Sequence, residues 1–186
     1  MGGIKYADLN GDGRITADDQ TWIFSPVPDL SMGLNVNLSW RNFDLQMFWQ
    51  GVFGQDVYND QKFQTDFWSL TDAGSNKGDR MLNAWTQDNI SSKIPALTTN
   101  NTSDEGRTST YFVENGSYFK LRTLQIGYNL PEKVLKACHM ANARVYVSGN
   151  NLLTLKSKSL TCPDPENPRW MYPNSTQLTF GLQVGF

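Results

Sequence analysis

The chain has 186 residues, a formal net charge of -2 and only 18% charged residues. This balance argues against a nucleic-acid-binding protein, which would present a basic face, and the charged fraction is below the roughly 25% of a typical soluble domain. Aromatic residues make up 12% of the chain. A membrane β-barrel has this kind of composition, because only alternate residues of each strand face lipid.

The sequence contains no stretch approaching the roughly 18 consecutive apolar residues of a transmembrane helix. Residues Met1 to Tyr6 lack the apolar segment of a secretory signal peptide. We therefore expect either a secreted soluble domain processed elsewhere or a fragment of a longer outer-membrane protein. The number of strands predicted below favours the fragment.

Near the start of the chain, Asp8 begins a motif with the spacing of an EF-hand calcium loop. Oxygen-bearing side chains stand at three alternate positions, a glycine follows for the sharp turn, and a carboxylate closes the loop. The closing residue is Asp, as in dockerin-type loops. An Asx-rich turn that satisfies its own backbone is the alternative. The expected cofactor is Ca²⁺, and its candidate ligands are Asp8, Asn10, Asp12, the backbone carbonyl of Arg14, and Asp19.

The segment from Leu30 to Trp40 alternates apolar and polar residues without interruption, which predicts a strand. Its length suits a tilted transmembrane strand of about 9–11 residues. Arg41 and Asn42 can form a two-residue turn, after which the alternation resumes from Phe43 to Gln50. Two long strands with a minimal turn predict a β-hairpin.

A long irregular stretch follows, from about residue 51 to residue 116, and loops of this length are usually functional. Within it, Phe63, Phe67 and Leu70 stand at helical spacing and predict a helix between Gln55 and Leu70.

Three more strands are predicted after this loop, at about 117–130, 143–153 and 175–186. Leu121 breaks the parity of the first of these, so we expect a β-bulge near Arg122 and Thr123. Pro131 ends that strand and can open a short helix as far as Cys138.

Alternation alone also fits a soluble sandwich, but the connections favour a membrane barrel. Their lengths run short, long, medium, long, as in barrels with short periplasmic turns and long extracellular loops. Aromatic residues stand at the predicted periplasmic strand ends, where an aromatic girdle belongs: Trp40, Phe43, Tyr128 and Phe186. Five strands are fewer than the about 8 of the smallest barrels, which again indicates a fragment.

The last strand also resembles the C-terminal signal read by the barrel assembly machinery. The residues that carry this resemblance are Thr179, Gly181, Val184 and Phe186. The predicted strand directions place Cys138 and Cys162 on opposite sides of the membrane, so we expect two free thiols rather than a disulfide.

Several ordered stretches resemble the SusC/RagA family of TonB-linked outer-membrane proteins of Bacteroidetes, across essentially the whole chain and always as the family's C-terminal part. They include Ile4 to Gly13, Asn42 to Gly51, Val113 to Tyr118, Ile126 to Pro131, Arg144 to Leu152 and Thr179 to Leu182. The resemblance implies the C-terminal antiparallel strands of a large barrel, with residues 1–29 as an extracellular calcium-like loop and residues 30–186 as barrel strands and loops. The plug domain and TonB box are absent from this stretch.

The resemblance further implies import of oligosaccharides or peptides across the bacterial outer membrane. Its expected partners are a SusD-like surface lipoprotein, TonB through the missing N-terminal region, outer-membrane lipid and the barrel assembly machinery. Aromatic side chains in the predicted extracellular loops are candidate substrate contacts, although such residues more often pack loops together: Trp68, Trp85, Trp170 and Tyr172. Asn35, Asn37, Asp44, Gln46 and Gln50 are expected to line the lumen.

No pattern for nucleophilic catalysis or phosphate binding is present. His139 adjoins Cys138, but we interpret both as solvent-facing residues of a turn. We therefore predict a transport component rather than an enzyme. The alternative is a secreted soluble β-sheet binding module with a dockerin-like calcium loop, which would carry charged residues on both faces of its strands.

Overall fold

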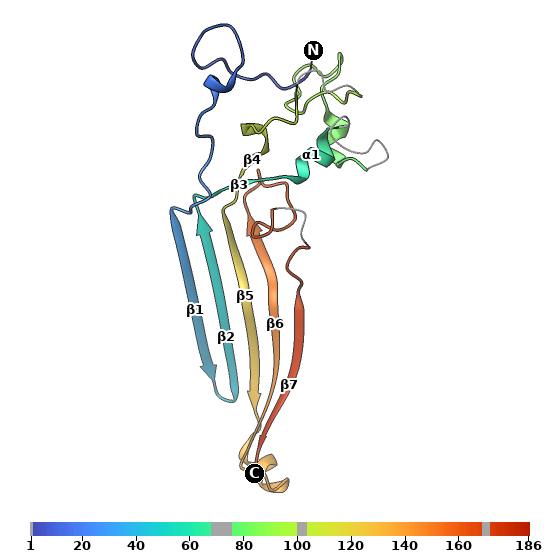
Figure 1. Cartoon of the computed structure of the whole chain (residues 1–186). Coiled ribbons are helices and arrows are strands. Elements are labelled where there is room, and N and C mark those ends of the chain that lie inside the picture. The colour runs from blue at the N-terminus through green and yellow to red at the C-terminus, as the bar shows by residue number, and fades with distance from the viewer. Residues whose placement is uncertain (1, 68–75, 100–103, 169–171) are drawn as a thin grey trace.

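A computed structural model describes residues 2–67, 76–99, 104–168 and 172–186 of the chain. Its largest element is an antiparallel sheet of five strands in the order β1-β2-β5-β6-β7 (Figure 1). The strands are β1 (Leu30–Trp40), β2 (Phe43–Phe53), β5 (Tyr118–Asn129), β6 (Asn142–Lys156) and β7 (Gln177–Gly185). The predicted all-β class with five long antiparallel strands is confirmed.

The strand register gives this sheet one polar and one apolar face. Paired residues of neighbouring strands point to the same side, and pairs such as Gln46 with Gln125 and Leu45 with Ile126 match in polarity. The polar face carries Asn35, Asn37, Asp44, Gln46, Gln50, Lys120, Thr123, Gln125, Ser148, Asn150, Thr179 and Gln183. The apolar face stays open to the surroundings, and Phe180, for example, is 78% exposed.

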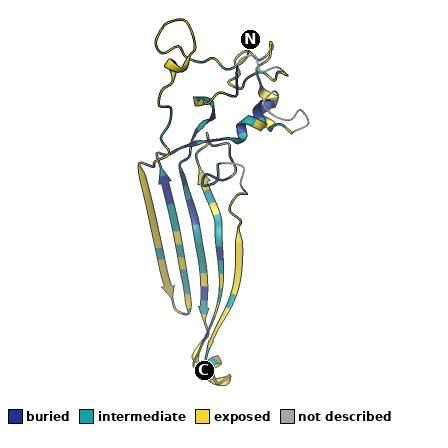
Figure 2. Cartoon of the chain, viewed as in Figure 1, coloured by how far each residue is buried: buried dark blue, intermediate teal, exposed yellow. Residues whose placement is uncertain are grey.

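The two edge strands are the most exposed part of the sheet. Among the described residues, β1 pairs only with β2, and β7 pairs only with β6. Figure 2 shows both edges as largely exposed, whereas buried positions lie on the central strands and in the loops. Each edge therefore offers a row of backbone groups that can pair with a further strand.

The connections separate into a short end and a long end. The turn at Arg41 and Asn42, the helix α2 (Glu132–Ala137) and the C-terminus lie at one end of the sheet, and the long segments lie at the other (Figure 1). At the short end the rings of Phe43 and Tyr128 pack 4.7 Å apart. The predicted alternation of connection lengths is thus present in the fold. None of the helices formed by the described residues is long and apolar enough to cross a membrane.

At the long end the connecting segments form a layer with its own small core, which we call the loop layer. A second sheet pairs β3 (Asp56–Tyr58) with β4 (Val113–Asn115), and three short helical segments flank it. These segments are α1 (Gln61–Asp66), η2 (Asp79–Asn83) and η3 (Thr110–Phe112), while a fourth, η1 (Ala17–Asp19), lies near the N-terminus. Phe112 is fully buried and stacks on Phe63 at 4.3 Å between ring centroids.

The stretch from Gln55 to Leu70, predicted to hold a helix, does hold one, but the helix is short. Only Gln61–Asp66 is helical, and Leu70 lies outside the described residues. Asp56–Tyr58 is extended instead, because its backbone pairs with Val113–Asn115. This long-range pairing keeps Asp56–Tyr58 out of the helix, whereas Phe63 lies within the helix and Phe67 is its C-cap.

The β-bulge predicted near Arg122 and Thr123 is present. Leu121 faces Trp49 and Thr123 faces Phe48, which leaves Arg122 as the extra residue on β5. The pairing with β6 shifts at the same place. The bulge returns Leu124 to the same face as Leu121, which the sequence alternation requires.

A close contact between β6 and β7 generates a first prediction. A Cβ atom on Gly181 would lie 2.1 Å from the ring of Tyr146, its partner in the register. Gly181→Val should therefore displace Tyr146 and destabilise the fold by about 1–3 kcal/mol, the usual cost of overpacking. The measurement is the unfolding midpoint of the full-length protein in detergent, followed by heat-dependent electrophoretic mobility.

Gly33 on β1 provides a matched control, because a Cβ there would meet only Phe48, at 3.3 Å. Gly33→Val should change the midpoint little, and Tyr146→Ala added to Gly181→Val should recover part of the loss. An unchanged midpoint for Gly181→Val would contradict the contact.

Candidate functional site

The polar face of the five-stranded sheet holds the residues predicted to line a lumen. Asn37 pairs with Gln46, and Asn35 pairs with Phe48, so the predicted residues of β1 and β2 share one face. Towards the short end, the carboxylate of Asp44 accepts two hydrogen bonds from the Arg144 guanidinium, at 2.5 and 3.0 Å. Gly127 separates the two strands here, and a Cβ on it would lie 2.4 Å from Asp44 Oδ1. This bidentate ion pair joins β6 to β2 across β5. The spacing of these residues in the sequence does not predict it.

The calcium-like loop near the N-terminus folds as a set of side-chain to backbone turns. Asp8 accepts hydrogen bonds from the backbone N–H groups of Gly11 and Gly13, at 2.7 and 2.8 Å. Asp19 accepts from Thr16 and Leu9, at 2.7 and 2.8 Å, and these bonds hold the pKa of its carboxyl below the ordinary value. Gly13 adopts φ +79, the left-handed conformation that the sharp turn needs.

The side chains of this loop carry oxygen atoms of the kind that bind hard cations, but these atoms do not converge on one point. Carboxylate and amide oxygens are the ligands that Ca²⁺ prefers, and Asp8, which accepts one N–H on each oxygen, retains free lone pairs. In the part of the chain that the structure describes, however, no three His, Cys, Asp or Glu side chains converge as a metal site would require. Binding would therefore draw Asp8, Asp12 and Asp19 closer together.

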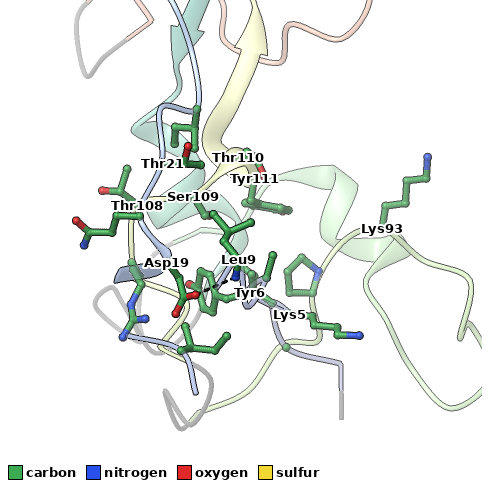
Figure 3. Close-up of a pocket in the computed structure, with 18 of the residues that line it drawn as sticks. Lys5, Tyr6, Leu9, Asp19, Thr21, Lys93, Thr108, Ser109, Thr110 and Tyr111 are labelled. Atoms are coloured by element: carbon green, nitrogen blue, oxygen red, sulfur yellow. Dashed lines mark hydrogen bonds between the residues drawn. The ribbon is translucent and has the colours of Figure 1, made fainter. Parts of the chain in front are cut away.

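A large cavity lies in the loop layer beside this motif. It measures about 1140 Å³ and is lined by the N-terminal segment, the stretch 92–95 and the stretch 107–111. Figure 3 shows Tyr6, Leu9 and Asp19 on one side of the cavity and Thr108 to Tyr111 on the other, with Lys5 and Lys93 at its margin. Arg107 lies over the Tyr6 ring, 5.3 Å from its centroid. The cavity thus combines aromatic and cationic side chains.

The four aromatic residues predicted as substrate contacts have different environments. Trp68 and Trp170 lie outside the described residues. Trp85 lines the cavity, but its ring also packs on Gly2, where a Cβ would lie 2.6 Å from the indole. Tyr172 is 96% exposed. Trp85 therefore packs two segments together, whereas Tyr172 offers a free aromatic surface.

Two buried ion-pair networks connect the loop layer, and the sequence pattern did not predict either of them. Lys120, only 1% exposed, donates to Glu166 at 2.6 Å and to Asp164 at 3.4 Å. Lys62 pairs with Glu114 at 2.8 Å. The partners are separated by 44 or more residues, so only the fold brings them together.

These networks hold three carboxyl groups ionised. Burial by itself would raise the pKa of Glu114, Asp164 and Glu166, but hydrogen bonds and nearby lysines outweigh it and lower all three values. The groups that lower the pKa differ. They are Lys62 and Thr161 for Glu114, backbone N–H groups and Lys120 for Asp164, and Lys120, Tyr118 and Arg122 for Glu166.

The residues of the predicted assembly signal lie at the end of the edge strand. Thr179, Gly181 and Val184 are in β7, and Phe186 beyond it is 95% exposed. Cys138, with His139, is exposed next to α2 at the short end, and Cys162 is buried in the loop layer. Both thiols are free, and their placement at opposite ends of the sheet agrees with the prediction.

The chain is similar over its whole length to known receptors. It is 34% identical to TonB-dependent receptor P3 of Formosa agariphila, covering 100% of this chain and 19% of that receptor. It is 27% identical to TonB-dependent receptor SusC of Bacteroides thetaiotaomicron, covering 97% of this chain and 17% of SusC. The chain thus spans about a fifth of the length of the curated relatives that it matches. No family model matches it.

Solved structures give the same relationship. The chain superposes on the RagAB peptide importer in its closed-closed state with a TM-score of 0.77 and 28% identity, over 96% of this chain and 20% of the matched one. The open-open state gives a TM-score of 0.74 and 29% identity, over 93% and 19%. The five-stranded sheet therefore has the fold of the corresponding part of these proteins.

The three carboxyl groups generate a prediction of pH dependence. A carboxyl whose folded pKa is lowered stabilises the fold above its unfolded value, about 4.3 for Glu, and this contribution is lost as the pH falls through the folded value. The protection of backbone amides against hydrogen exchange in residues 157–168 should therefore stay constant from pH 7 to pH 5 and should fall at pH 3. The loss approaches roughly tenfold for each pKa unit of lowering once the pH is below the folded pKa. Hydrogen exchange of the full-length protein, corrected for intrinsic rates, measures it.

Glu114→Gln should reduce this pH dependence, because it removes one of the three titrating groups. Equal protection at pH 3 and pH 7 would contradict the assignment of charged carboxylates to this layer.

Proposed function

The chain belongs to the SusC/RagA family of TonB-dependent receptors, and from this premise we propose that it is the C-terminal barrel part of an outer-membrane importer. The observation that carries the proposal is the five-stranded sheet with one polar and one apolar face. The proposed cargo is a bulky nutrient, an oligosaccharide or a peptide. The role is non-enzymatic, in keeping with relatives that are receptors and an importer.

The physical case starts from the exposed apolar face. Leu34, Ile126 and Phe180 are between 45% and 78% exposed, and such a surface is costly in water but favourable in lipid. Backbone groups within a bilayer must be paired, so the open edges of β1 and β7 require further strands that close a barrel. The polar face then lines the lumen, and a soluble binding module would leave this apolar face in water.

The orientation follows from the connections. Bacterial outer-membrane barrels have short periplasmic turns and longer extracellular loops. The short end, with Arg41, α2 and Phe186, is thus periplasmic, and the loop layer lies outside the cell. The half-buried Arg144–Asp44 pair belongs to the periplasmic half of the lumen wall.

The proposed partners follow from the family. A SusD-like lipoprotein would sit over the loop layer, TonB would act through a region outside this chain, and the barrel assembly machinery would read the strand that ends in Phe186. Of the aromatic residues in the loops, we propose Tyr172 as a substrate contact, because its ring is almost fully exposed.

The orientation and the activity can be tested in the full-length transporter on intact cells. Leu82, 89% exposed in the loop layer, is replaced by cysteine, and cells are treated with a membrane-impermeant maleimide. Leu82→Cys should label on intact cells, whereas the native, exposed Cys138 should label only after the outer membrane is opened.

Deletion of the gene should abolish growth on at least one oligosaccharide or peptide source, and the intact gene should restore it.

The native Cys138 is a matched control, because it is equally a surface thiol but lies at the short end. Labelling of Cys138 on intact cells together with a silent Leu82→Cys would reverse the orientation. Unchanged growth on every such nutrient would contradict import.

We also propose that the N-terminal loop binds Ca²⁺ through Asp8, Asn10, Asp12, the Arg14 carbonyl and Asp19. The support is the donor chemistry at EF-hand spacing, with Gly13 in the left-handed turn. The role of the ion would be to order an extracellular loop, since its proposed ligands are exposed or half-buried rather than part of a catalytic cluster.

Calorimetric titration of the full-length protein with Ca²⁺ tests this site. Asp12→Ala should remove the binding heat or weaken the affinity by about tenfold or more, because it removes a ligand and a negative charge. Asp18→Ala is the matched control, an exposed carboxylate of the same loop that is not a proposed ligand. Absence of heat with the intact loop, or equal loss in both variants, would disprove calcium binding here.

A further inference from the structure

The segment from Ser157 to Pro168, together with Asn174, forms what we call the clamped loop between β6 and β7. It folds back against the polar face of the sheet, where Lys120 and Arg122 of β5 reach it. Lys120 donates to Asp164 and Glu166, and Arg122 donates to Glu166 and, at 2.6 Å, to Gln50 of β2. Since Lys120 faces Gln50 and Thr154 in the register, these contacts place the loop over the polar face.

The β-bulge makes the contact with Arg122 possible. Arg122 is the extra residue of β5 and so has no direct partner on β2 or β6. Its guanidinium reaches the side chains of Gln50, which lies on the polar face, and of Asn151 and Glu166. Bulges re-aim a side chain in this way where a strand needs an added contact.

The base of the clamped loop is closed by its own acidic residues. The backbone N–H of Asn174 donates to Asp164 Oδ2 at 2.9 Å, and its side-chain amide donates to Glu166 Oε2 at 2.9 Å. Asp164 and Glu166 thus each accept hydrogen bonds from Lys120 of the sheet and from Asn174 of their own loop. Asp164 is 5% exposed, so its charge depends on these partners.

The other side of the clamped loop is fastened to the second sheet. Thr161 donates from its backbone N–H and its hydroxyl to Glu114 of β4, at 2.9 and 2.7 Å. Asn59 donates to both Thr161 and Glu114. Between the two fastenings, Leu160 and Cys162 pack with Val57, and Cys162 is fully buried.

We propose that the clamped loop is a fixed wall of the barrel mouth, and that Lys120 and Arg122 are positioning residues that hold it inside the lumen. Cargo that passes this end of the polar face would meet the clamped loop rather than the upper part of β5. Release would separate the buried Lys120 from both carboxylates and would expose the buried side chains of Leu160 and Cys162 to water, and both changes oppose opening. The assignment of the clamped loop to the lumen rests on the proposed function, whereas the contacts of Lys120 and Arg122 with the clamped loop do not depend on it.

Cys162 provides a native reporter for release of the clamped loop. Its thiol is fully buried, and burial raises its pKa to about 11, so both access and reactivity are suppressed while the loop is fastened. In the full-length transporter carrying Cys138→Ser, an impermeant maleimide should label Cys162 slowly on intact cells. Lys120→Met should accelerate this labelling by about tenfold or more, because the rate follows the population of the opened loop.

Lys158→Met is the matched control, since Lys158 is an exposed lysine of the same loop, and it should leave the rate unchanged. Should Lys120→Met fail to reach the membrane, Glu166→Gln keeps the side-chain size while removing the charge, and it should accelerate labelling in the same direction.

Leu82→Cys separates failure of this inference from failure of the proposed function. If Leu82→Cys labels while Lys120→Met and Glu166→Gln keep the parent rate at Cys162, the clamp is disproved and the orientation stands. Fast labelling of Cys162 in the parent also disproves the clamp. If Leu82→Cys does not label on intact cells, the orientation fails, and the same variants in detergent then test the fastening alone.

Discussion

The antiparallel ladder of the five strands fixes which residues can share a face, and the other features of the molecule depend on it. The strands alternate with period two, and the register places most polar residues opposite other polar residues from β1 to β7, with Phe48 as an apolar exception on the polar face. A slip of one residue would move Asp44 to the apolar face and away from Arg144. The apolar face, the polar lining and the open edges are thus consequences of one register.

The bulge at Arg122 connects this sheet to the loop layer. It corrects the parity of β5, so that Leu121 and Leu124 both remain on the apolar face, and it frees one arginine from the ladder. The freed side chain then contacts Glu166 in the loop between β6 and β7. A local irregularity of one strand therefore supplies one of the contacts that hold a distant loop.

The loop layer is held by charges and by a few aromatic rings rather than by a large core. Phe112 is fully buried among Tyr58, Phe63 and Phe67, while the Lys62–Glu114 and Lys120–Glu166 pairs join segments far apart in the chain. Breaking a buried pair is costly because it leaves an uncompensated charge. These loops are long, but buried ion pairs and ring contacts connect their fastened parts to segments far away in the chain.

The sequence by itself determined the five long strands, their faces, the bulge and the family, because period-two alternation and local motifs are properties of neighbouring residues. It also placed Cys138 and Cys162 at opposite ends, since this follows from strand direction. Only the tertiary structure decided that Asp56–Tyr58 is a strand and that Asp44 meets Arg144. The same holds for Lys120, Asp164 and Glu166, which form one buried cluster. These features depend on contacts across 40 or more residues, and no local pattern encodes which distant charges will be brought together.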